Sequence, residues 1–234
     1  MISESPSVMS RYEFVFTLIE DLKRVLHDIS IEDIEQKEHE KDLVTNVDKE
    51  VNNFIIDAIS NLYDDTIIGE ENSKKGNNKN VWYIDPIDGT TNFLYRKRDY
   101  AISIAFEGDK EKFGFVYDVK DDVLYHAEIS SGAFIDNKPF KRPETPAYGI
   151  LHITPNYLKE EKYEKYAELF QGLRYLEVCS IEIIRVAIGE ASSFYRKSQN
   201  EWDYKAAVIF AKMVGVPVVI TENNTVHVGT PFDA

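Results

Sequence analysis

The sequence predicts an α/β protein made of two halves, and three patterns carry this prediction. Apolar residues recur every three or four positions in two N-terminal stretches, which is the spacing of amphipathic helices. Short strand-like runs follow, and beyond Gly149 helical and strand-like segments alternate. We therefore expect an antiparallel meander in the first half, residues 1–146, and a second half, residues 147–234, wound more like a βαβ unit.

The elements of the first half follow from these patterns in chain order. Two helices are expected at residues 8–29 and 47–62, with Thr45 as the N-cap of the second. Strands are expected at residues 66–68, 81–84, 101–106, 113–118 and 123–127. A short turn separates the last two strands, so we expect them to form a hairpin.

The second half begins after PETPAYG, residues 143–149, which is the turn-rich candidate for a boundary. Its strands are expected at residues 150–153, 175–178, 194–195 and 216–220. Its helices are expected at residues 158–169, 181–188 and 202–214. This alternation of strand and helix is the basis for the βαβ-like interpretation.

The chain carries a strong negative charge that restricts its partners. Its 234 residues include 27 Lys and Arg but 41 Asp and Glu, for a formal net charge of −14. Nucleic-acid polymers and anionic membranes are therefore not expected partners, whereas divalent cations are. No apolar run approaches the ~20 residues of a membrane helix. The N-terminus lacks the pattern of a secretory signal, and the single Cys179 excludes an internal disulfide, so we expect a cytoplasmic protein.

The most informative stretch is WYIDPIDGTTNF, residues 82–93. An apolar strand delivers Asp85 to its C-terminal end, and Pro86 restricts the backbone that leads on to Asp88. Gly89 permits a sharp turn, after which its N–H group and that of Thr90 could bind a phosphate at a helix start. The stretch is typical of a metal-and-phosphate site, although a plain turn built from Asp, Pro and Gly is an open alternative. A calcium loop of the EF-hand type fits poorly, because Ile87 and Arg96 stand where oxygen ligands are needed.

Three other places add carboxylates. Glu70 and Glu71 follow a predicted strand, Asp48 lies in the first turn of a predicted helix, and Asp203 begins another helix after Trp202. Taken singly, each has a structural explanation: a surface pair, a charge favoured by the helix dipole and a helix cap.

Taken together, the motifs resemble those of the inositol monophosphatase family, the Mg²⁺-dependent and typically lithium-sensitive phosphomonoesterases. They are DLVTNVD (residues 42–48), GEE (69–71), WYIDPIDGTTNF (82–93) and WDYKAA (202–207), in the family's order and at about its spacing. The stretch 114–134 is also similar, and the resemblance runs from about residue 8 to the end. It implies alternating α-β-α-β-α layers with two sheets, and a homodimer.

The resemblance also implies ligands for two or three Mg²⁺ ions, with Mn²⁺ as a substitute. Glu70, Asp85 and the backbone carbonyl of Ile87 would hold a first ion. Asp85, Asp88 and Asp203 would hold a second, and Glu70 would help to bind a third, weaker ion. Such hard oxygen ligands suit Mg²⁺, and clustering this many carboxylates would be costly without cations.

Further roles are implied for the residues around these ligands. Asp48 and Thr90 would orient and deprotonate the attacking water, with Glu70 in the same catalytic set and no phosphoenzyme. The backbone amides of Gly89, Thr90 and Thr91 would bind the substrate phosphate.

The chain departs from the family where the alcohol half of the substrate would bind. The family usually has Gly-Ser/Thr-Ala-Ala where this chain has EVCS, residues 177–180, so Cys179 and Ser180 are expected to line the alcohol pocket. An acidic residue that commonly contacts inositol hydroxyls is replaced in a region that carries Arg196 and Lys197. These two could face a second phosphate or be plain surface charges. Most relatives also continue for another strand and helix, which predicts an incomplete second half.

The leading hypothesis is therefore a phosphoric monoester hydrolase acting on inositol monophosphate or a related small phosphorylated alcohol through metal-activated water. NADP(H) 2′-phosphate, fructose 1,6-bisphosphate and 3′-phosphoadenosine 5′-phosphate are alternative substrates for the same chemistry. A regulator that binds cations or a phospholigand without catalysis is the alternative from another class. The presence of every metal carboxylate together with Asp48 and Thr90 favours catalysis.

Overall fold

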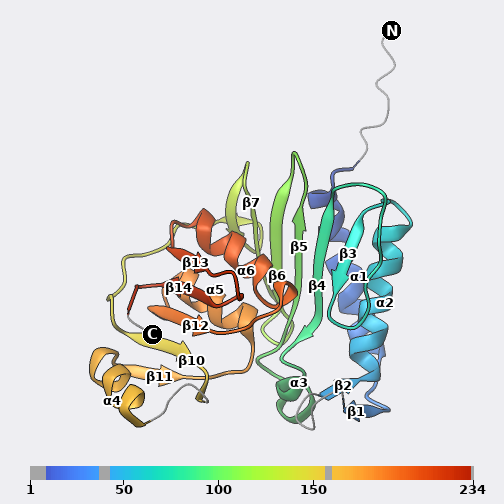
Figure 1. The fold of residues 1–234 in the computed structure, drawn as a ribbon. Coiled ribbons are helices and arrows are strands. Elements are labelled where there is room, and N and C mark those ends of the chain that lie inside the picture. Colours follow the sequence, from blue (N-terminus) through green and yellow to red (C-terminus); the bar gives the residue numbers. More distant parts are fainter. Residues whose placement is uncertain (1–8, 37–42, 156–159, 233–234) are drawn as a thin grey trace.

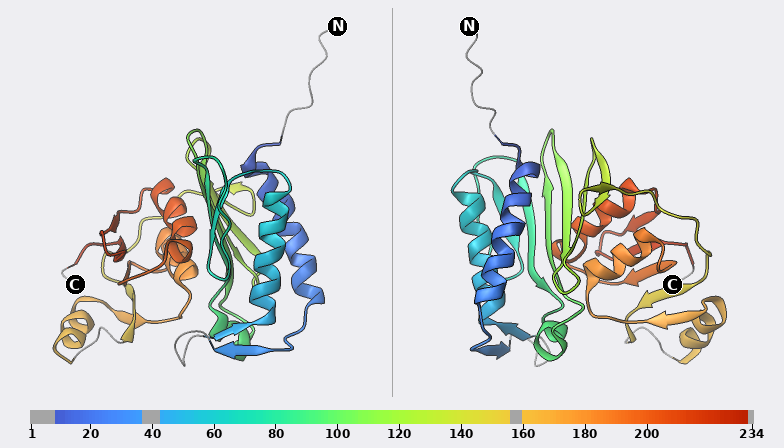
Figure 2. Two further views of the ribbon diagram at one scale, coloured as in Figure 1. Left: turned by 45° about the vertical axis from the view of Figure 1, so that its right-hand side comes forward. Right: turned by 180° about the vertical axis from the view of Figure 1, so that it is seen from behind.

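A computed structural model of the chain describes residues 9–36, 43–155 and 160–232. It has the predicted α-β-α-β-α layers (Figures 1 and 2). Helices α1 (Arg11–Asp28) and α2 (Asn46–Ser60) cover one face of a seven-stranded sheet, and α5 (Cys179–Ile188) and α6 (Glu201–Met213) cover the other. A five-stranded sheet follows, with α4 (Glu160–Leu169) beyond it.

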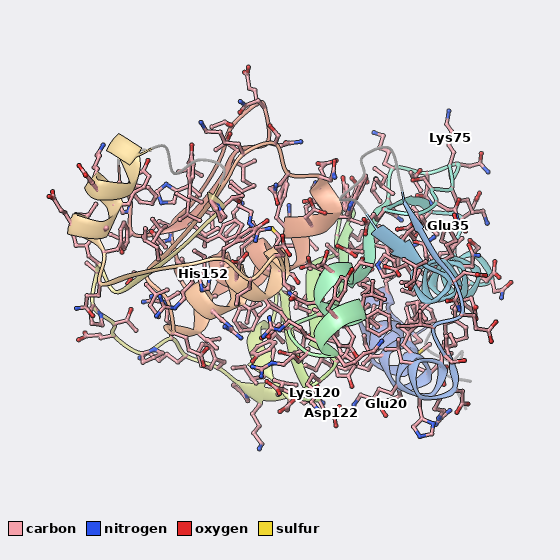
Figure 3. The ribbon with its side chains drawn as sticks, turned by 90° about the horizontal axis from the view of Figure 1, so that it is seen from below. Glu20, Glu35, Lys75, Lys120, Asp122 and His152 are labelled. Carbon is pink, nitrogen blue, oxygen red and sulfur yellow. The ribbon has the colours of Figure 1, made fainter. Side chains whose placement is uncertain are left out.

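The seven-stranded sheet follows the chain in order. Its strands are β3 (Thr66–Gly69), β4 (Val81–Asp88), β5 (Ala101–Glu107), β6 (Lys112–Asp118), β7 (Val123–Glu128), β8 (Gly132–Ile135) and β9 (Lys138–Pro139). Only β3 and β4 pair in parallel, so the predicted meander and the β6–β7 hairpin are confirmed. At the hairpin turn, Asp122 lies close to Glu20 of α1 (Figure 3). Lys23 of α1 lies 2.8 Å from Asp122 and 3.1 Å from Glu20.

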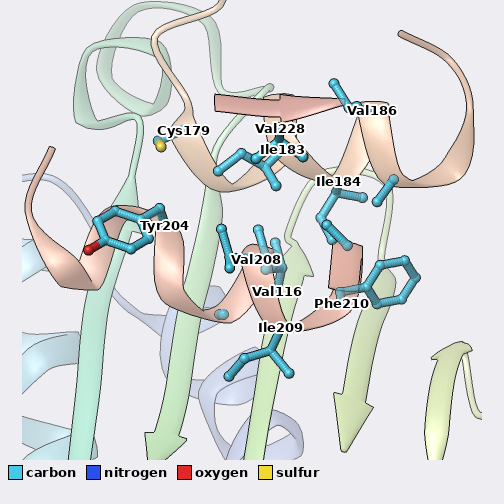
Figure 4. Packing of buried hydrophobic residues seen from close by; sticks show 14 of the residues in the cluster. Val116, Cys179, Ile183, Ile184, Val186, Tyr204, Val208, Ile209, Phe210 and Val228 are labelled. Atoms are coloured by element: carbon cyan, nitrogen blue, oxygen red, sulfur yellow. The ribbon is translucent and has the colours of Figure 1, made fainter. Parts of the chain in front are cut away.

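Side chains of the central strands alternate between two cores. Trp82 and Phe115 pack under α1 and α2, whereas Tyr83 and Val116 pack under α5 and α6. Because both faces are covered, these strands read as nearly continuous apolar runs. Figure 4 shows the second core, in which α5 and α6 pack against each other. A Cβ atom at Gly114 would lie 2.3 Å from the Ala206 carbonyl oxygen, so glycine lets α6 approach β6.

The five-stranded sheet has the order β11-β10-β12-β14-β13. Its strands are β10 (Ile150–Ile153), β11 (Gly172–Arg174), β12 (Ser193–Arg196), β13 (Val218–Ile220) and β14 (Val226–Gly229). Strand β10 pairs in parallel with β11 and β12, as the βαβ-like interpretation requires, whereas β14 is antiparallel to both β12 and β13. The division of the chain at residue 146 stays a prediction.

The predicted strand at residues 175–178 is wrong. The strand is β11, which ends at Arg174, and residues 175–178 form a loop in which Glu177 adopts a φ of +63°. That backbone conformation cannot continue a strand.

Several shorter elements were not expected from the sequence: β1 (Ile34–Gln36), β2 (Leu43–Thr45), α3 (Thr90–Arg96), β8, β9 and β14. Most other boundaries differ from the predictions by one to three residues; β4 runs four residues further, to Asp88, and positions 8 and 158–159 lie outside the described residues. Over the described residues, no helix is long and apolar enough to cross a membrane.

Candidate active site

The site lies at the carboxyl end of β4, where the chain turns into α3 (Figure 1). A bulge between Asp85 and Asp88 sets two residues of β4, Pro86 and Ile87, against one residue of β5, and bulges of this kind redirect side chains. The Asp85 carboxylate accepts a hydrogen bond from the Ile87 N–H at 3.1 Å. Both carboxylates are nearly fully buried, so the loop holds them in place.

Gly89 makes the turn from β4 into α3. It has a φ of +96°, and a Cβ atom there would lie 2.7 Å from a Val178 methyl group. Glycine is therefore needed both for the backbone angle and for the contact. Thr90 and Thr91 form the first turn of α3, where N–H groups have no acceptor within the helix.

Asp48 and Thr90 meet directly. The Thr90 hydroxyl lies 2.8 Å from Asp48 Oδ1 and 3.2 Å from the Ile87 carbonyl oxygen, and its single proton can be donated to only one of them at a time. The other Asp48 oxygen accepts from the Thr45 N–H at 2.9 Å and from the Thr45 hydroxyl. Thr45 is the N-cap of α2, as predicted, and Asp48 completes its capping box. Asp48 is thus a helix cap that also accepts a hydrogen bond from Thr90.

Asp203 reaches the site from α6 and, like Asp48, completes the capping box of its helix. It is the third residue of that helix, and its carboxylate accepts from the Asn200 N–H at 2.9 Å. Glu70 comes from the end of β3, where its N–H donates to the Ile84 carbonyl of β4 at 3.1 Å. Two helix starts and two strand ends therefore bring their carboxylates to one place.

These residues surround a single pocket of about 190 Å³. Pockets for drug-sized ligands span roughly 300–1,000 Å³, so this one suits a smaller molecule. It is lined by Glu70, Asp85, Ile87, Asp88, Gly89, Thr90, Thr91, Glu177, Cys179, Arg196, Gln199 and Asp203. Ten of these twelve were expected from the sequence.

Four residues of this region depart from the sequence expectations. Asp48 lies behind Thr90, and Ser180 is fully buried behind Asp88 rather than in the pocket wall. Glu177 and Gln199 line the pocket without having been predicted. Glu177 stands at a position where the family usually has glycine. That departure is the feature of the sequence from which Glu177 could have been predicted to line the pocket.

The carboxylates disfavour one another's charge. Burial, then Glu70, Asp88 and Asp203, raises the pKa of Asp85 well above its usual value. Burial and Asp88 raise the pKa of Asp203 to about 8. Within the part of the chain that the structure describes, no three such side chains already form a metal cage. The donors are hard oxygens that repel one another, which fits a site for divalent cations of the Mg²⁺ type.

Asp88 joins the two halves of the site. It accepts from the Cys179 N–H at 3.1 Å and from the Ser180 N–H at 2.6 Å, with a further bond from the Ser180 hydroxyl. These are the first residues of α5, so Asp88 caps that helix from another part of the fold. Burial raises the pKa of Asp88 to about 6, although the Ser180 bonds oppose the shift.

Arg196 lines the pocket, and the buried carboxylate of Glu182 fixes its guanidinium group. Its guanidinium bonds to Glu182, which is fully buried in α5. The same Glu182 carboxylate accepts from the Leu176 N–H at 2.8 Å and lies 3.1 Å from His152 Nδ1 on β10 (Figure 3). Burial is the largest influence and would by itself lower the pKa of Arg196, but Glu182, together with smaller contributions from Cys179, Tyr175 and Asp88, raises that pKa overall.

Comparisons with known proteins agree with this geometry. A profile of the Inositol monophosphatase family matches residues 6–231. The inositol-1-monophosphatase of Bacillus subtilis (strain 168) is 34% identical over 223 residues, which are 85% of this chain and 83% of that protein.

Solved structures resemble the fold closely. Inositol monophosphatase-II from Staphylococcus aureus MSSA476 aligns with a TM-score of 0.81 at 30% identity, covering 95% of this chain and 92% of that one. SaIMPase-II with bound inositol monophosphate aligns with a TM-score of 0.77 at 27% identity, covering 94% and 88%. Fold and site together define a phosphoric monoester hydrolase. The chain belongs to the inositol monophosphatase family, as its motifs indicated.

Proposed function

We propose that the protein is a Mg²⁺-dependent phosphomonoesterase of inositol monophosphate or a related small phosphorylated alcohol. The observation that carries this proposal is the convergence of four carboxylates with the Asp48–Thr90 pair around one small pocket. A binding protein without catalysis has no use for a hydroxyl already bonded to a buried carboxylate beside a cation site.

The ligand sets follow the sequence expectation. Glu70, Asp85 and the Ile87 carbonyl would hold one Mg²⁺, and Asp85, Asp88 and Asp203 a second, with Glu70 contributing to a third. When bound, the ions supply positive charge that stabilises the phosphoryl oxygens and acidifies water. The four carboxylates fit this role because their mutual repulsion is relieved by cations.

The chain's own residues then orient and accept protons. Thr90 donates its hydroxyl proton to Asp48, so the lone pairs of its oxygen are directed to a hydrogen of the attacking water. As the water loses that proton to Thr90, the Thr90 proton moves to Asp48 Oδ1. The Gly89, Thr90 and Thr91 amides at the start of α3 would bind the phosphate oxygens.

Removal of the metal provides the test of this function. We expect phosphate release from inositol 1-phosphate to require Mg²⁺, to stop after exhaustive EDTA treatment and to return when Mg²⁺ is restored. Excess Ca²⁺ should inhibit, because its longer and looser coordination misplaces the water. Full turnover in the EDTA-treated protein contradicts the proposal.

Asp88→Asn should reduce kcat at least tenfold while the fold is kept, because one charged ligand of the second ion is lost. Without metal, thermal stability should change little: a buried charge whose pKa is raised has been removed, but one of the two α5 N–H groups loses its oxygen acceptor. The gain in Tm on adding Mg²⁺ should shrink. Asp88→Ala, which also removes the acceptor of the α5 N–H groups, should instead lower Tm. An Asp88→Asn variant that keeps more than a tenth of kcat, a loss below ~1.4 kcal/mol, contradicts the ligand assignment.

Four finer expectations are part of the same proposal. Support by Mn²⁺, inhibition by lithium and a homodimer follow from the family resemblance, whereas a cytoplasmic location follows from the cysteine content of the sequence. Steady-state kinetics with each ion and light scattering of the purified protein test the first three.

A further inference from the structure

The loop at residues 175–178 presents an acidic side chain to the pocket in a strained conformation. Glu177 lines the pocket with a φ of +63°, in the left-handed region that disfavours residues with a Cβ atom. The family usually has glycine there, which adopts this angle freely. A strained residue that lines a functional pocket points to a role for its side chain.

The loop is held on both sides of Glu177. The Leu176 N–H donates to Glu182, and the Leu176 carbonyl accepts from the Asn92 side chain of α3. On the other side, the Cys179 N–H group is bonded to Asp88. Hydrogen bonds of the neighbouring residues therefore fix the backbone around Glu177. These bonds, and not the conformational preference of a glutamate, keep Glu177 at its positive φ.

The charges near Glu177 and Arg196 in the pocket disfavour the binding of a second phosphate group. The cation of Arg196 is already paired with Glu182, and both are buried. Glu177 adds an exposed acidic residue to the lining of the same pocket, which also includes Gln199, and its carboxylate is hydrogen-bonded to Tyr175. A carboxylate accepts hydrogen bonds from hydroxyl groups but repels a phosphate.

We propose that Glu177 is a specificity-determining residue that binds hydroxyl groups of the leaving alcohol and disfavours substrates with a second phosphate. The inference rests on the proposed function and narrows its substrate class to polyol monophosphates.

Glu177→Gly is the decisive variant because glycine suits the backbone angle. We expect its Tm to hold or rise, as the strain is removed. We expect the ratio of kcat/KM for inositol 1-phosphate to that for p-nitrophenyl phosphate, which carries no hydroxyl group, to fall roughly tenfold. The ratio of kcat/KM for fructose 1,6-bisphosphate to that for inositol 1-phosphate should rise. Glu177→Gln, of the same size, should reproduce the gain on the bisphosphate.

Glu222→Gln is the matched control, since it removes one exposed carboxylate that does not line the pocket. It should leave both ratios unchanged. Unchanged ratios in Glu177→Gly, or a fall in Tm with equal losses on all three substrates, overturn the inference and make Glu177 a structural residue.

Calorimetric titration with inositol 1-phosphate in the presence of Ca²⁺ separates this inference from the proposed function. If the wild-type protein hydrolyses no ester yet Glu177→Gly binds the ligand roughly tenfold more weakly, the proposed function fails and the subsite stands. If the wild-type protein is active and the variant matches it in binding and selectivity, only the subsite fails.

Discussion

Asp48→Asn is expected to lower kcat by roughly 100- to 10,000-fold, the range typical for loss of a general base. The Thr90 hydroxyl would then face an amide instead of a carboxylate, and the route by which the water loses its proton would be closed. KM should change little, because Asp48 lies behind Thr90 and does not line the pocket. Steady-state kinetics with saturating Mg²⁺ provide the measurement.

The stability effect of this variant has to be separated from the catalytic one, because Asp48 also caps α2. Glu13→Gln is a matched control: Glu13 completes the same capping box in α1, where it accepts from the Ser10 N–H at 3.0 Å. Each substitution should cost about 1 kcal/mol or less, since the amide oxygen can still accept. Only Asp48→Asn should affect turnover.

Thr90 variants test whether the two residues act as a unit. Thr90→Ser keeps the hydroxyl and should retain most activity, whereas Thr90→Val should resemble Asp48→Asn. The double variant with Asp48→Asn and Thr90→Val should be little worse than either single one, because the losses of coupled residues do not add. Independent, additive losses, or an Asp48→Asn variant with more than a tenth of wild-type kcat, contradict the pair mechanism.

The sequence predicted most of this site because its local chemistry is visible in short motifs. An apolar strand that ends in DPIDG places Asp85, Asp88 and Gly89 at one sheet edge whatever the rest of the fold does. Asp48 and Asp203 could be explained as helix caps or as site residues. Both are helix caps; Asp203 also lines the pocket, and Asp48 bonds to Thr90, which lines it, so the two interpretations are compatible.

Contacts between distant segments could not be predicted. The bond from Ser180 to Asp88 spans 92 positions, and nothing local to Ser180 distinguishes a pocket residue from one that supports a carboxylate. The strand expected at residues 175–178 failed because its apolar pattern was outweighed by tertiary bonds to Leu176 that force Glu177 out of extended geometry. Strand β14 was missed because it is short, and it is stabilised by pairing with β12 and β13.

The sequence already contained signals of the buried contacts that Glu182 makes with Arg196 and His152. Glu182 interrupts an apolar helix, CSIEIIRVAI, and His152 interrupts an apolar strand, ILHI. A polar or charged residue on a fully buried face requires a hydrogen-bond partner, so each implied a contact. Which residue would supply it depended on how β10, β12 and α5 pack.

Glu182→Ala is expected to lower the free energy of unfolding by about 3–5 kcal/mol, the usual cost of breaking a buried ion pair. The variant leaves the Arg196 guanidinium without its carboxylate and the Leu176 N–H and His152 without an acceptor. For a chain of this size each kcal/mol shifts Tm by roughly 2–4 °C, so Tm should fall by about 6–20 °C. Urea unfolding followed by two probes measures the effect and checks that unfolding is cooperative.

Three further variants separate the charge from the packing. Glu182→Gln keeps an acceptor for Leu176 but loses the charge, so its loss should be intermediate. Combining Glu182→Leu with Arg196→Met removes both charges and should recover much of the stability, because apolar residues can replace a buried pair. Glu201→Ala breaks the partly exposed pair with Lys205, which keeps its ion pair with Glu107, and should cost less than about 1 kcal/mol. A Glu182→Ala variant as stable as Glu201→Ala would show that Arg196 finds another partner, and the pocket wall would then not depend on Glu182.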